Sequence, residues 1–276
     1  MEHIGYRHFE VRPCNPVIGA RVRGLRFGPH LPDEAIEEVK VALDRHLVLF
    51  FEGQDITPAE QVAFGRRFGR LQVHQYLPSL PDHPEIVVLE NDRDRPPQVN
   101  FWHSDVTFLE EPPLGSILLA REIPPCGGDT IWSNMYAAYE ALSEPVRRAV
   151  DGLRAVHVGQ VERYEAAYGK GGDAPRKPPR AEHPVVRIHP RTGRKALFVH
   201  PAATASIVGL PKSESDALLQ MLFRHADTPE FQVRLTWMRD MVAFWDNRCT
   251  QHYAVADYWP ERRLMHRVTM DGDRPY

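Results

Sequence analysis

Residues 245–268 read WDNRCTQHYAVADYWPERRLMHRV and combine strand-like runs with histidines and arginines. Successive side chains of an extended chain point to opposite faces, so residues two apart share a face. Arg263, Met265 and Arg267 would therefore lie on the same face of one strand. Two guanidinium groups on a buried face are costly unless anions meet them. The stretch thus predicts a core β-strand that directs two cationic groups at one site.

Most of the remaining chain reads as short strands separated by turn residues. The strand candidates, rich in β-branched and aromatic residues, are 46–51, 85–91, 115–123, 129–133, 183–189, 195–200, 231–237, 241–247 and 263–270. The expected helices are 31–46, 57–69, 133–142 and 213–226, with a capping box at Thr57 and serine caps on the last two. Strands and helices do not alternate regularly, so their order predicts a β-sandwich or barrel with flanking helices rather than a doubly wound sheet.

The bulk composition is that of an ordinary globular chain. Its 276 residues are 42% hydrophobic and 26% charged, with a formal net charge of −3. This small charge gives no field that would attract nucleic acid or an anionic membrane, so we expect neither partner. The longest apolar runs are far shorter than the roughly 20 residues needed to span a bilayer. The three cysteines form no CxxC pair, which favours a reducing cytoplasm.

The segment WHSDVTF, at 102–108, contains two metal-capable side chains one residue apart. If this segment is extended, His103 and Asp105 project to the same side and Ser104 turns away. An HxD pair alone is a weak signal, because such triplets also occur by chance as hydrogen-bonded surface pairs. His252, which lies 149 positions after His103, is the expected third ligand. Two imidazoles and a carboxylate with open coordination positions form the facial triad of non-haem Fe(II) oxygenases.

Cys249 is a rival third ligand, because a thiolate would favour zinc. It lies three residues before His252 and would face the other way on a strand, so we exclude it. Two explanations are open for the arginine pair. Acidic residues of the protein could neutralise Arg263 and Arg267, or the planar forks could bind carboxylate or sulfonate groups of ligands. The neighbouring metal-ligand pattern favours ligands.

Four segments, in order along the chain, carry a family resemblance: WHSDVTF, GGDTIW (127–132), HPVVRIHP (183–190) and WDNRCTQHYAVADYWPERRLMHRVT (245–269). They resemble the taurine dioxygenase/TfdA family of Fe(II)- and 2-oxoglutarate-dependent dioxygenases. The similarity runs from about Val17 to the C-terminus, and the spacing from His252 to Arg263 matches the family's HX(10–13)R element. It implies one domain over 1–276 with a double-stranded β-helix, a cupin-like jelly roll. It also implies a homo-oligomer, a dimer or a tetramer.

The resemblance implies a role for each motif residue. Three residues would ligate Fe(II) and carry the catalysis, two would hold the far carboxylate of 2-oxoglutarate, and one would bind the substrate's anionic group. In the same order, these are His103, Asp105 and His252, then Thr130 and Arg263, then Arg267. The reaction would consume O₂, convert 2-oxoglutarate to succinate and CO₂, and hydroxylate a small anionic substrate. A hydroxylated carbon that bears sulfonate, sulfate or aryloxy oxygen would then become an aldehyde and release sulfite, sulfate or phenol.

The substrate-contacting positions depart from the taurine pattern. His74 matches a substrate-contacting histidine of the family. Taurine enzymes carry a tyrosine where this chain has Leu77, next to Tyr76, and an asparagine where it has Val99. An aromatic position of the family is occupied by Ala203. These changes replace polar contacts by apolar ones, so we expect a longer or more apolar anion than taurine and poor turnover of taurine itself.

Three other functions are alternatives to this one: taurine dioxygenase proper, a zinc hydrolase with the same three ligands, and a non-catalytic jelly roll that binds an anion. The stretch GKGGDAPRKPPR, at 169–180, resists regular structure and is either a surface loop or part of a mobile lid over 159–181. His189, His200 and His266 are expected to satisfy backbone groups.

Overall fold

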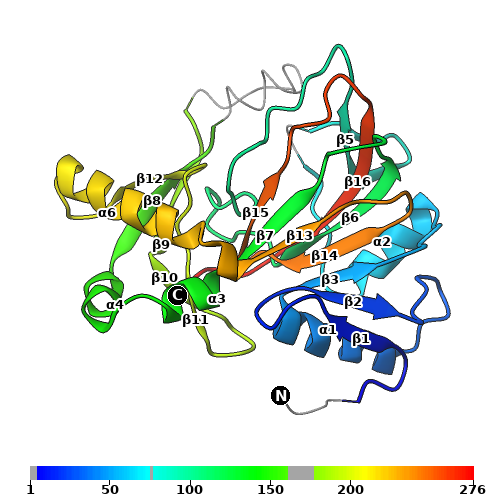
Figure 1. Ribbon diagram of the computed structural model, residues 1–276, viewed down its shortest axis with the longest axis horizontal. Coiled ribbons are helices and arrows are strands. Elements are labelled where there is room, and N and C mark those ends of the chain that lie inside the picture. The colour runs from blue at the N-terminus through cyan, green and yellow to red at the C-terminus, as the bar shows by residue number, and fades with distance from the viewer. Residues whose placement is uncertain (1–4, 75–76, 161–176) are drawn as a thin grey trace.

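The computed structural model describes residues 5–74, 77–160 and 177–276. Within these residues the strands form one eight-stranded sheet, two three-stranded sheets and one two-stranded sheet. Helices cover the outside of the sheets (Figure 1). This arrangement confirms the expected class, a mainly β fold with flanking helices.

The large sheet has the strand order β1 (Glu10–Pro13), β2 (Ala20–Arg23), β3 (Val48–Phe51), β14 (Val242–Asp246), β6 (Gly115–Glu122), β16 (Arg263–Met270), β5 (His83–Asn91) and β4 (Ser79–Leu80). The small sheets are β13 (Gln232–Leu235), β7 (Thr130–Asn134) and β15 (Thr250–Ala254), then β12 (Thr204–Ile207), β8 (Arg154–Val158) and β9 (Arg180–Pro184), then β10 (Val186–Ile188) and β11 (Lys195–Leu197). The helical segments are α1 (Asp33–His46), α2 (Pro58–Arg66), α3 (Met135–Glu140), α4 (Glu144–Val150), α6 (Lys212–Ala226) and the short 3₁₀ turn η1 (Pro229–Phe231).

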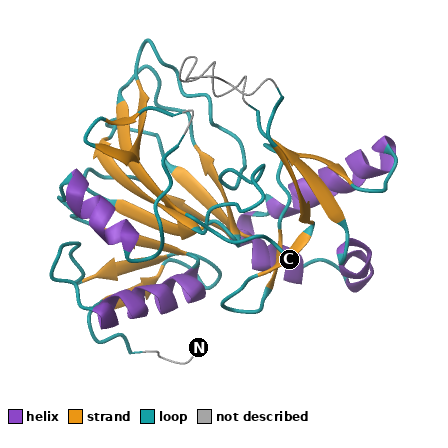
Figure 2. Cartoon of the chain, turned by 180° about the vertical axis from the view of Figure 1, so that it is seen from behind, coloured by secondary structure: helices purple, strands orange, loops and turns teal. Residues whose placement is uncertain are grey.

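The central strands of the large sheet are buried on both faces. In β3, Val48 and Phe50 belong to one core and Leu49 and Phe51 to another. The first core lies between the sheet and the elements β7, β13, α3 and α6. The second lies under α1 and α2, which cover the other face, as Figure 2 shows from behind. Because both faces are buried, these strands read as continuous apolar runs instead of alternating ones.

Strand β16 lies between β6 and β5, so its backbone is paired on both edges. Arg263, Met265 and Arg267 are buried, whereas Leu264 and His266 are only partly buried. The alternation that the sequence predicted for this strand is therefore confirmed. It directs both arginines to the inner face of the sheet.

Element starts differ from the expectation at several places. The capping box at Thr57 is present, but Asn134 rather than Ser133 caps α3, because its side chain accepts two backbone N–H groups. Helix α6 begins at Lys212 after Pro211 and has no side-chain cap, so the serine cap expected there is wrong. The strand expected at 183–189 is divided into β9 and β10. Helix α4 and the strands β1, β2, β4, β8, β12 and β15 were not expected.

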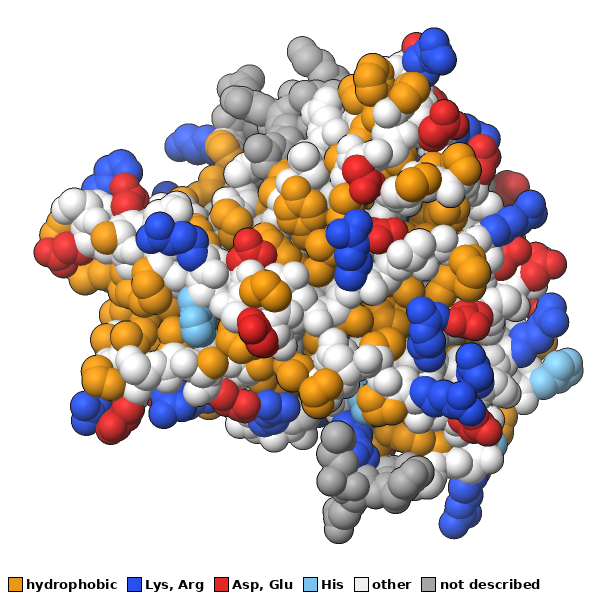
Figure 3. All heavy atoms as spheres, in the orientation of Figure 1, with side chains coloured by type: hydrophobic (Ala, Val, Ile, Leu, Met, Phe, Trp, Pro, Cys, Tyr) orange, Lys and Arg blue, Asp and Glu red, His pale blue; other side chains and the backbone are white. Residues whose placement is uncertain are grey.

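Surface charges of both signs are interspersed on the face drawn in Figure 3. Many charged side chains at the surface are paired; Arg262, for example, bridges Glu90 and Glu122. Among the described residues, no helix has both the length and the apolar character needed to cross a membrane.

Gly115 marks the tightest contact between β6 and β14. A Cβ atom at this position would lie 2.3 Å from the backbone oxygen of Trp245, and that oxygen cannot move away without separating the two paired strands. We expect Gly115→Ala to lower the free energy of unfolding by about 1–3 kcal/mol, the usual cost of overpacking. Urea unfolding measures this change. Gly28→Ala is the control, since nothing lies within 4 Å of its Cβ position, and an equal effect of both substitutions would contradict the packing argument.

Candidate metal centre and its cavity

The backbones of His103 and His252 pair with each other across 149 residues of sequence. His103 N donates to His252 O at 3.0 Å, and His252 N donates to His103 O at 2.7 Å. His252 belongs to β15, whereas His103 forms only this isolated bridge, so the strand assumed around His103 is a single paired residue. Ser104 turns away, as expected, and donates to the carbonyl of Thr250 at 2.8 Å. The bridge holds the two imidazoles with ring centroids 4.0 Å apart.

Asp105 is held on its backbone and on its side chain. Asn247 accepts from Asp105 N at 2.7 Å and donates to Asp105 O at 3.0 Å. Ser116 donates to one carboxylate oxygen, Oδ2, at 3.0 Å, and Arg267 Nη1 donates to the other, Oδ1, at 3.0 Å. Asn247 follows β14 and Ser116 lies on β6, so the large sheet fixes this carboxylate.

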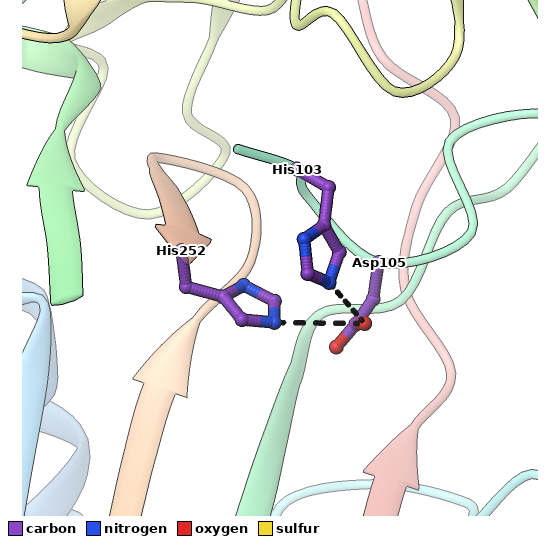
Figure 4. A group of neighbouring side chains, drawn as sticks. All are labelled: His103, Asp105 and His252. Carbon is purple, nitrogen blue, oxygen red and sulfur yellow. Dashed lines mark ion pairs between the residues drawn. The ribbon is translucent and has the colours of Figure 1, made fainter. Parts of the chain in front are cut away.

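The three side chains converge on one point (Figure 4). Nε2 of His103 and Nε2 of His252 each lie 3.9 Å from Oδ1 of Asp105. Nδ1–H of His103 donates to the carbonyl of Phe101 at 3.0 Å, so the lone pair of a neutral His103 ring is on Nε2 and faces the other ligands. One ligand atom from each residue lies within 4.8 Å of the others. Two imidazole nitrogens and a carboxylate oxygen in this arrangement suit Fe(II).

The protonation states also fit a metal ion. Burial lowers the pKa of His103 and lowers that of His252 well below its usual value, so both rings are neutral at neutral pH. Burial alone would raise the pKa of Asp105, but the charge of Arg267, together with the hydrogen bond from Ser116, outweighs it and holds this pKa well below its usual value. A metal would therefore meet two lone pairs and one negative charge without first displacing protons.

The ligand atoms open into a cavity of about 130 Å³. Its lining includes, besides the three candidate ligands, the predicted residues His74, Leu77, Val99, Thr130, Ala203, Arg263 and Arg267. Tyr76, the remaining predicted contact, lies outside the described residues. The structure thus gathers residues from widely separated parts of the sequence around one space that a small ligand could fill.

Thr130 and Arg263 lie on the inner strands β7 and β16. The indole N–H of Trp237 donates to Oγ1 of Thr130 at 3.0 Å, which leaves the hydroxyl proton available for an acceptor in the cavity. Gly128, at φ +72, lets the backbone approach Arg263, because a Cβ there would lie 3.3 Å from that arginine's Cδ and Nε. Gly128 belongs to the GGDTIW motif identified in the sequence, whereas no motif in the sequence indicated a role for Trp237.

An acidic residue of the protein partly neutralises Arg267, which is the first of the two explanations given above for the arginine pair. Its only ion pair among the described residues is with Asp105, which is itself a candidate metal ligand. Its Nε has no hydrogen-bond partner among the same residues and is shielded from solvent. Arg263 is also buried, with its guanidinium carbon 5.8 Å from the ring centroid of Tyr258. Both groups line the cavity, so a ligand anion could meet each of them.

A second cluster, His189, Asp246 and Cys249, has ligand atoms close enough for a metal but is already satisfied. Nδ1 of His189 accepts two backbone N–H groups, so its proton is on Nε2 and is donated to Asp246 at 3.1 Å. Arg248 donates to both oxygens of Asp246. Burial raises the pKa of Cys249 well above its usual value, so its thiol keeps the proton. This cluster is structural, and Cys249 lies outside the candidate metal centre, as expected.

One expectation about surrounding residues needs correction, and another falls largely on residues that the structure does not describe. His200 was expected to satisfy a backbone group, but its Nε2 contacts the hydroxyl of Thr107 at 2.8 Å and its side chain lines the cavity. The proposed lid over 159–181 lies largely outside the described residues. Its last two positions, Arg180 and Ala181, belong to β9, and the lid itself stays a prediction.

Comparison with known proteins agrees with this geometry. The sequence profile of the family described as "Taurine catabolism dioxygenase TauD, TfdA family" matches residues 10–269. An alpha-ketoglutarate-dependent sulfate ester dioxygenase of Pseudomonas putida is 37% identical to this chain, over 96% of this chain and 90% of the length of that protein. A 2,4-dichlorophenoxyacetate dioxygenase of Cupriavidus pinatubonensis is 33% identical over 94% of this chain and 96% of its own.

A solved structure shows the same fold. The crystal structure of a taurine dioxygenase from Burkholderia xenovorans superposes with a TM-score of 0.85 and 38% sequence identity, over 97% of this chain and 92% of that chain. Alpha-ketoglutarate is another name for 2-oxoglutarate. The sheets described above are therefore those of the cupin-type jelly roll. The chain belongs to the taurine catabolism dioxygenase TauD/TfdA family and is an oxidoreductase that depends on Fe(II), 2-oxoglutarate and O₂.

Proposed function

We propose that His103, Asp105 and His252 are the iron ligands of this dioxygenase. The observation that carries this proposal is the convergence of their ligand atoms, with both imidazole nitrogens 3.9 Å from the same carboxylate oxygen. Three protein ligands leave the remaining positions of a six-coordinate ion open. When bound, iron and 2-oxoglutarate supply the activation of O₂ that hydroxylates the substrate and yields succinate and CO₂. The zinc-hydrolase alternative gives Thr130 and Arg263 no role, and the complete set of three candidate metal ligands weighs against a binding-only jelly roll.

Thr130 and Arg263 would bind 2-oxoglutarate. Thr130 can donate its hydroxyl proton to a carboxylate, because its oxygen already accepts from Trp237. Arg263 offers a planar pair of N–H groups, which matches a carboxylate in a charge-assisted fork. Both residues line the cavity that contains the iron ligands, which supports a shared ligand.

Arg267 and His74 would bind the anionic group of the substrate. Arg267 donates one N–H to Asp105 and keeps Nε free of protein partners among the described residues. Nδ1 of His74 accepts from Leu77 N at 3.1 Å, so a neutral His74 carries its proton on Nε2. These groups would hold the anion so that one C–H bond of the substrate lies near the iron.

The remaining lining favours an apolar organic part. Leu77, Val99 and Ala203 replace polar or aromatic contacts of taurine enzymes, and Val158 and Phe108 line the same cavity. Relatives of this chain act on sulfate esters and on an aryloxyalkanoate. We therefore assign an alkyl sulfate, alkyl sulfonate or aryloxyalkanoate as substrate class. Taurine is the second candidate, favoured by the structural similarity to a taurine dioxygenase.

The cellular location, domain organisation, oligomeric state and partners of the enzyme are also proposals. Cys14, Cys126 and Cys249 are free thiols, which suits a reducing cytoplasm. A single domain over 1–276, a homodimer or homotetramer, and the absence of nucleic-acid and membrane partners stay predictions.

The metal and cosubstrate roles are tested together by anaerobic titration with Fe(II) and 2-oxoglutarate. We expect a weak visible charge-transfer band in the wild type and its loss in Asp105→Ala, because that variant lacks the only anionic ligand of the three. Asp216→Ala, on the surface helix α6, should keep the band. A wild-type protein without a band, or one that binds zinc and hydrolyses an ester instead, would sink the proposal.

The substrate class is tested with hexyl sulfate, hexanesulfonate, 2,4-dichlorophenoxyacetate and taurine as a panel. We expect one of the first three to have a kcat/KM well above that of taurine, measured by released sulfate, sulfite or phenol. Arg267→Met should lower this kcat/KM by about 10- to 100-fold, since hydrogen bonds to charged groups contribute about 1.5–3 kcal/mol. Arg262→Met is the control, because Arg262 points outward to Glu90. Efficient turnover of taurine at low concentration would overturn the assignment.

His74 should contribute no pH dependence to substrate binding near neutral pH. Burial, with a smaller contribution from Arg267, lowers the pKa of His74 to about 4, so this ring is neutral between pH 5.5 and 8. We expect the KM for the preferred panel compound to have the same pH dependence across this range in the wild type and in His74→Gln. A KM that decreases from pH 7 to pH 6 only in the wild type would show that a charged imidazole binds the anion.

A further inference from the structure

Thr107, two residues after Asp105, is fully buried and is contacted by three buried histidines. Its hydroxyl oxygen lies 2.9 Å from Nδ1 of His157 and 2.8 Å from Nε2 of His200. Its carbonyl oxygen accepts from Nε2 of His183 at 2.8 Å. These four residues, Thr107, His157, His183 and His200, form a unit that we name the Thr107 clamp.

The clamp requires neutral rings, and burial keeps them neutral. One hydroxyl satisfies both rings when it donates to the unprotonated nitrogen of one and accepts from the N–H of the other. Burial lowers the pKa of His157 to about 3 and lowers that of His200 well below its usual value. Burial also lowers the pKa of His183, the donor to the carbonyl. At neutral pH all the contacts of Thr107 are therefore available.

The segment from Asp105 to Thr107 is attached to two different sheets, one at each end. His157 lies on β8 and His183 on β9, so Thr107 is fixed to the three-stranded sheet of β12, β8 and β9. Asp105 is fixed to the large sheet through its contacts with residues of β6 and of the turn after β14. Between them Val106 has φ 53, a left-handed value that β-branched residues rarely adopt. Contacts at both ends are needed to hold such a residue in place.

The same segment forms a wall of the cavity. Val106, Thr107 and Phe108 line it together with Asp105 and His200. A displacement of Thr107 would therefore move this wall relative to the candidate iron ligand. Misplacement of reacting groups by about 1 Å can lower a rate by about 100-fold.

We propose that Thr107 is a positioning residue, whose clamp by His157, His183 and His200 fixes the substrate-side wall of the cavity relative to Asp105. This inference rests on the iron-ligand role proposed above for Asp105. When the wall is displaced, the substrate C–H bond no longer lies where oxidation occurs, although 2-oxoglutarate can still be consumed. Succinate formation is then uncoupled from product formation, so less product is released for each succinate formed.

The test compares three variants. Thr107→Val removes the hydroxyl and keeps the β-branched shape, while Thr107→Ser keeps the hydroxyl. Thr204→Val is the matched control: Thr204 lies on β12, its Oγ1 is 3.4 Å from Nε2 of His157, and it accepts from His200 N at 3.0 Å. It thus belongs to the same buried network but not to the cavity wall. The readouts are the thermal midpoint, the anaerobic Fe(II) and 2-oxoglutarate band, and the ratio of released product to succinate with the panel compound that the wild type converts fastest.

We expect Thr107→Val to keep the band and to lower the product-to-succinate ratio by at least about threefold, the signature of lost positioning rather than lost metal. Thr107→Ser should restore the ratio. Thr204→Val should lose a similar amount of thermal stability and keep the wild-type ratio. If Thr107→Val does not fold, His200→Asn, which shortens one arm of the clamp, carries the same expectation.

An unchanged ratio in a folded Thr107→Val, an equal loss in Thr204→Val, or no rescue by Thr107→Ser would overturn the positioning role. Loss of the band in Thr107→Val would also overturn it, because the effect would then lie in metal binding. Failure of the proposed function is distinct, since the band would be missing already in the wild type.

Discussion

The candidate site depends on a pair of backbone hydrogen bonds between His103 and His252. No helix or continuous strand contains both residues, so this single bridge sets the distance between two imidazoles. Backbone pairing has a fixed geometry, which makes it a more precise support than side-chain packing alone. The third candidate ligand, Asp105, follows two residues after His103 and is fixed by Asn247 and Ser116. Contacts within the protein therefore set the geometry of all three candidate ligands.

The large sheet gives this bridge a rigid base. Its central strands are buried on both faces, so they cannot shift without disturbing two cores at once. Strand β16 adds the two arginines to the inner face, at alternate positions separated by Met265. Charges in such a place are tolerated because Arg267 meets Asp105 and both groups line a cavity. One sheet thus supplies a hydrophobic support and a cationic surface.

The cavity divides into a polar part and an apolar part. The candidate iron ligands and the arginines are its polar residues; burial keeps the imidazoles neutral, and the charge of Arg267 keeps the carboxylate ionised. Leu77, Val99 and Ala203 belong to the apolar part. This division suits an anion with an apolar body, the chemical property shared by the sulfate esters and aryloxy acids of the relatives. Thr107 and His200 of the clamp line the same cavity.

The amino-acid sequence determined the features that follow from local periodicity and from motif spacing. The succession of short strands predicted a mainly β fold, and the alternation in β16 placed two arginines on one face. The HxD pair suggested metal ligands, and the family resemblance carried by the motifs implied the other side chains around the cavity. Short strands such as β15, and the cap at Asn134, were missed because their pairing and capping partners are remote in sequence or locally ambiguous. Only the tertiary structure decided that His200 faces Thr107 and not a backbone group, and that Trp237 orients Thr130. Such contacts join residues from distant parts of the chain, and the packing of sheets, which no local pattern encodes, selects them.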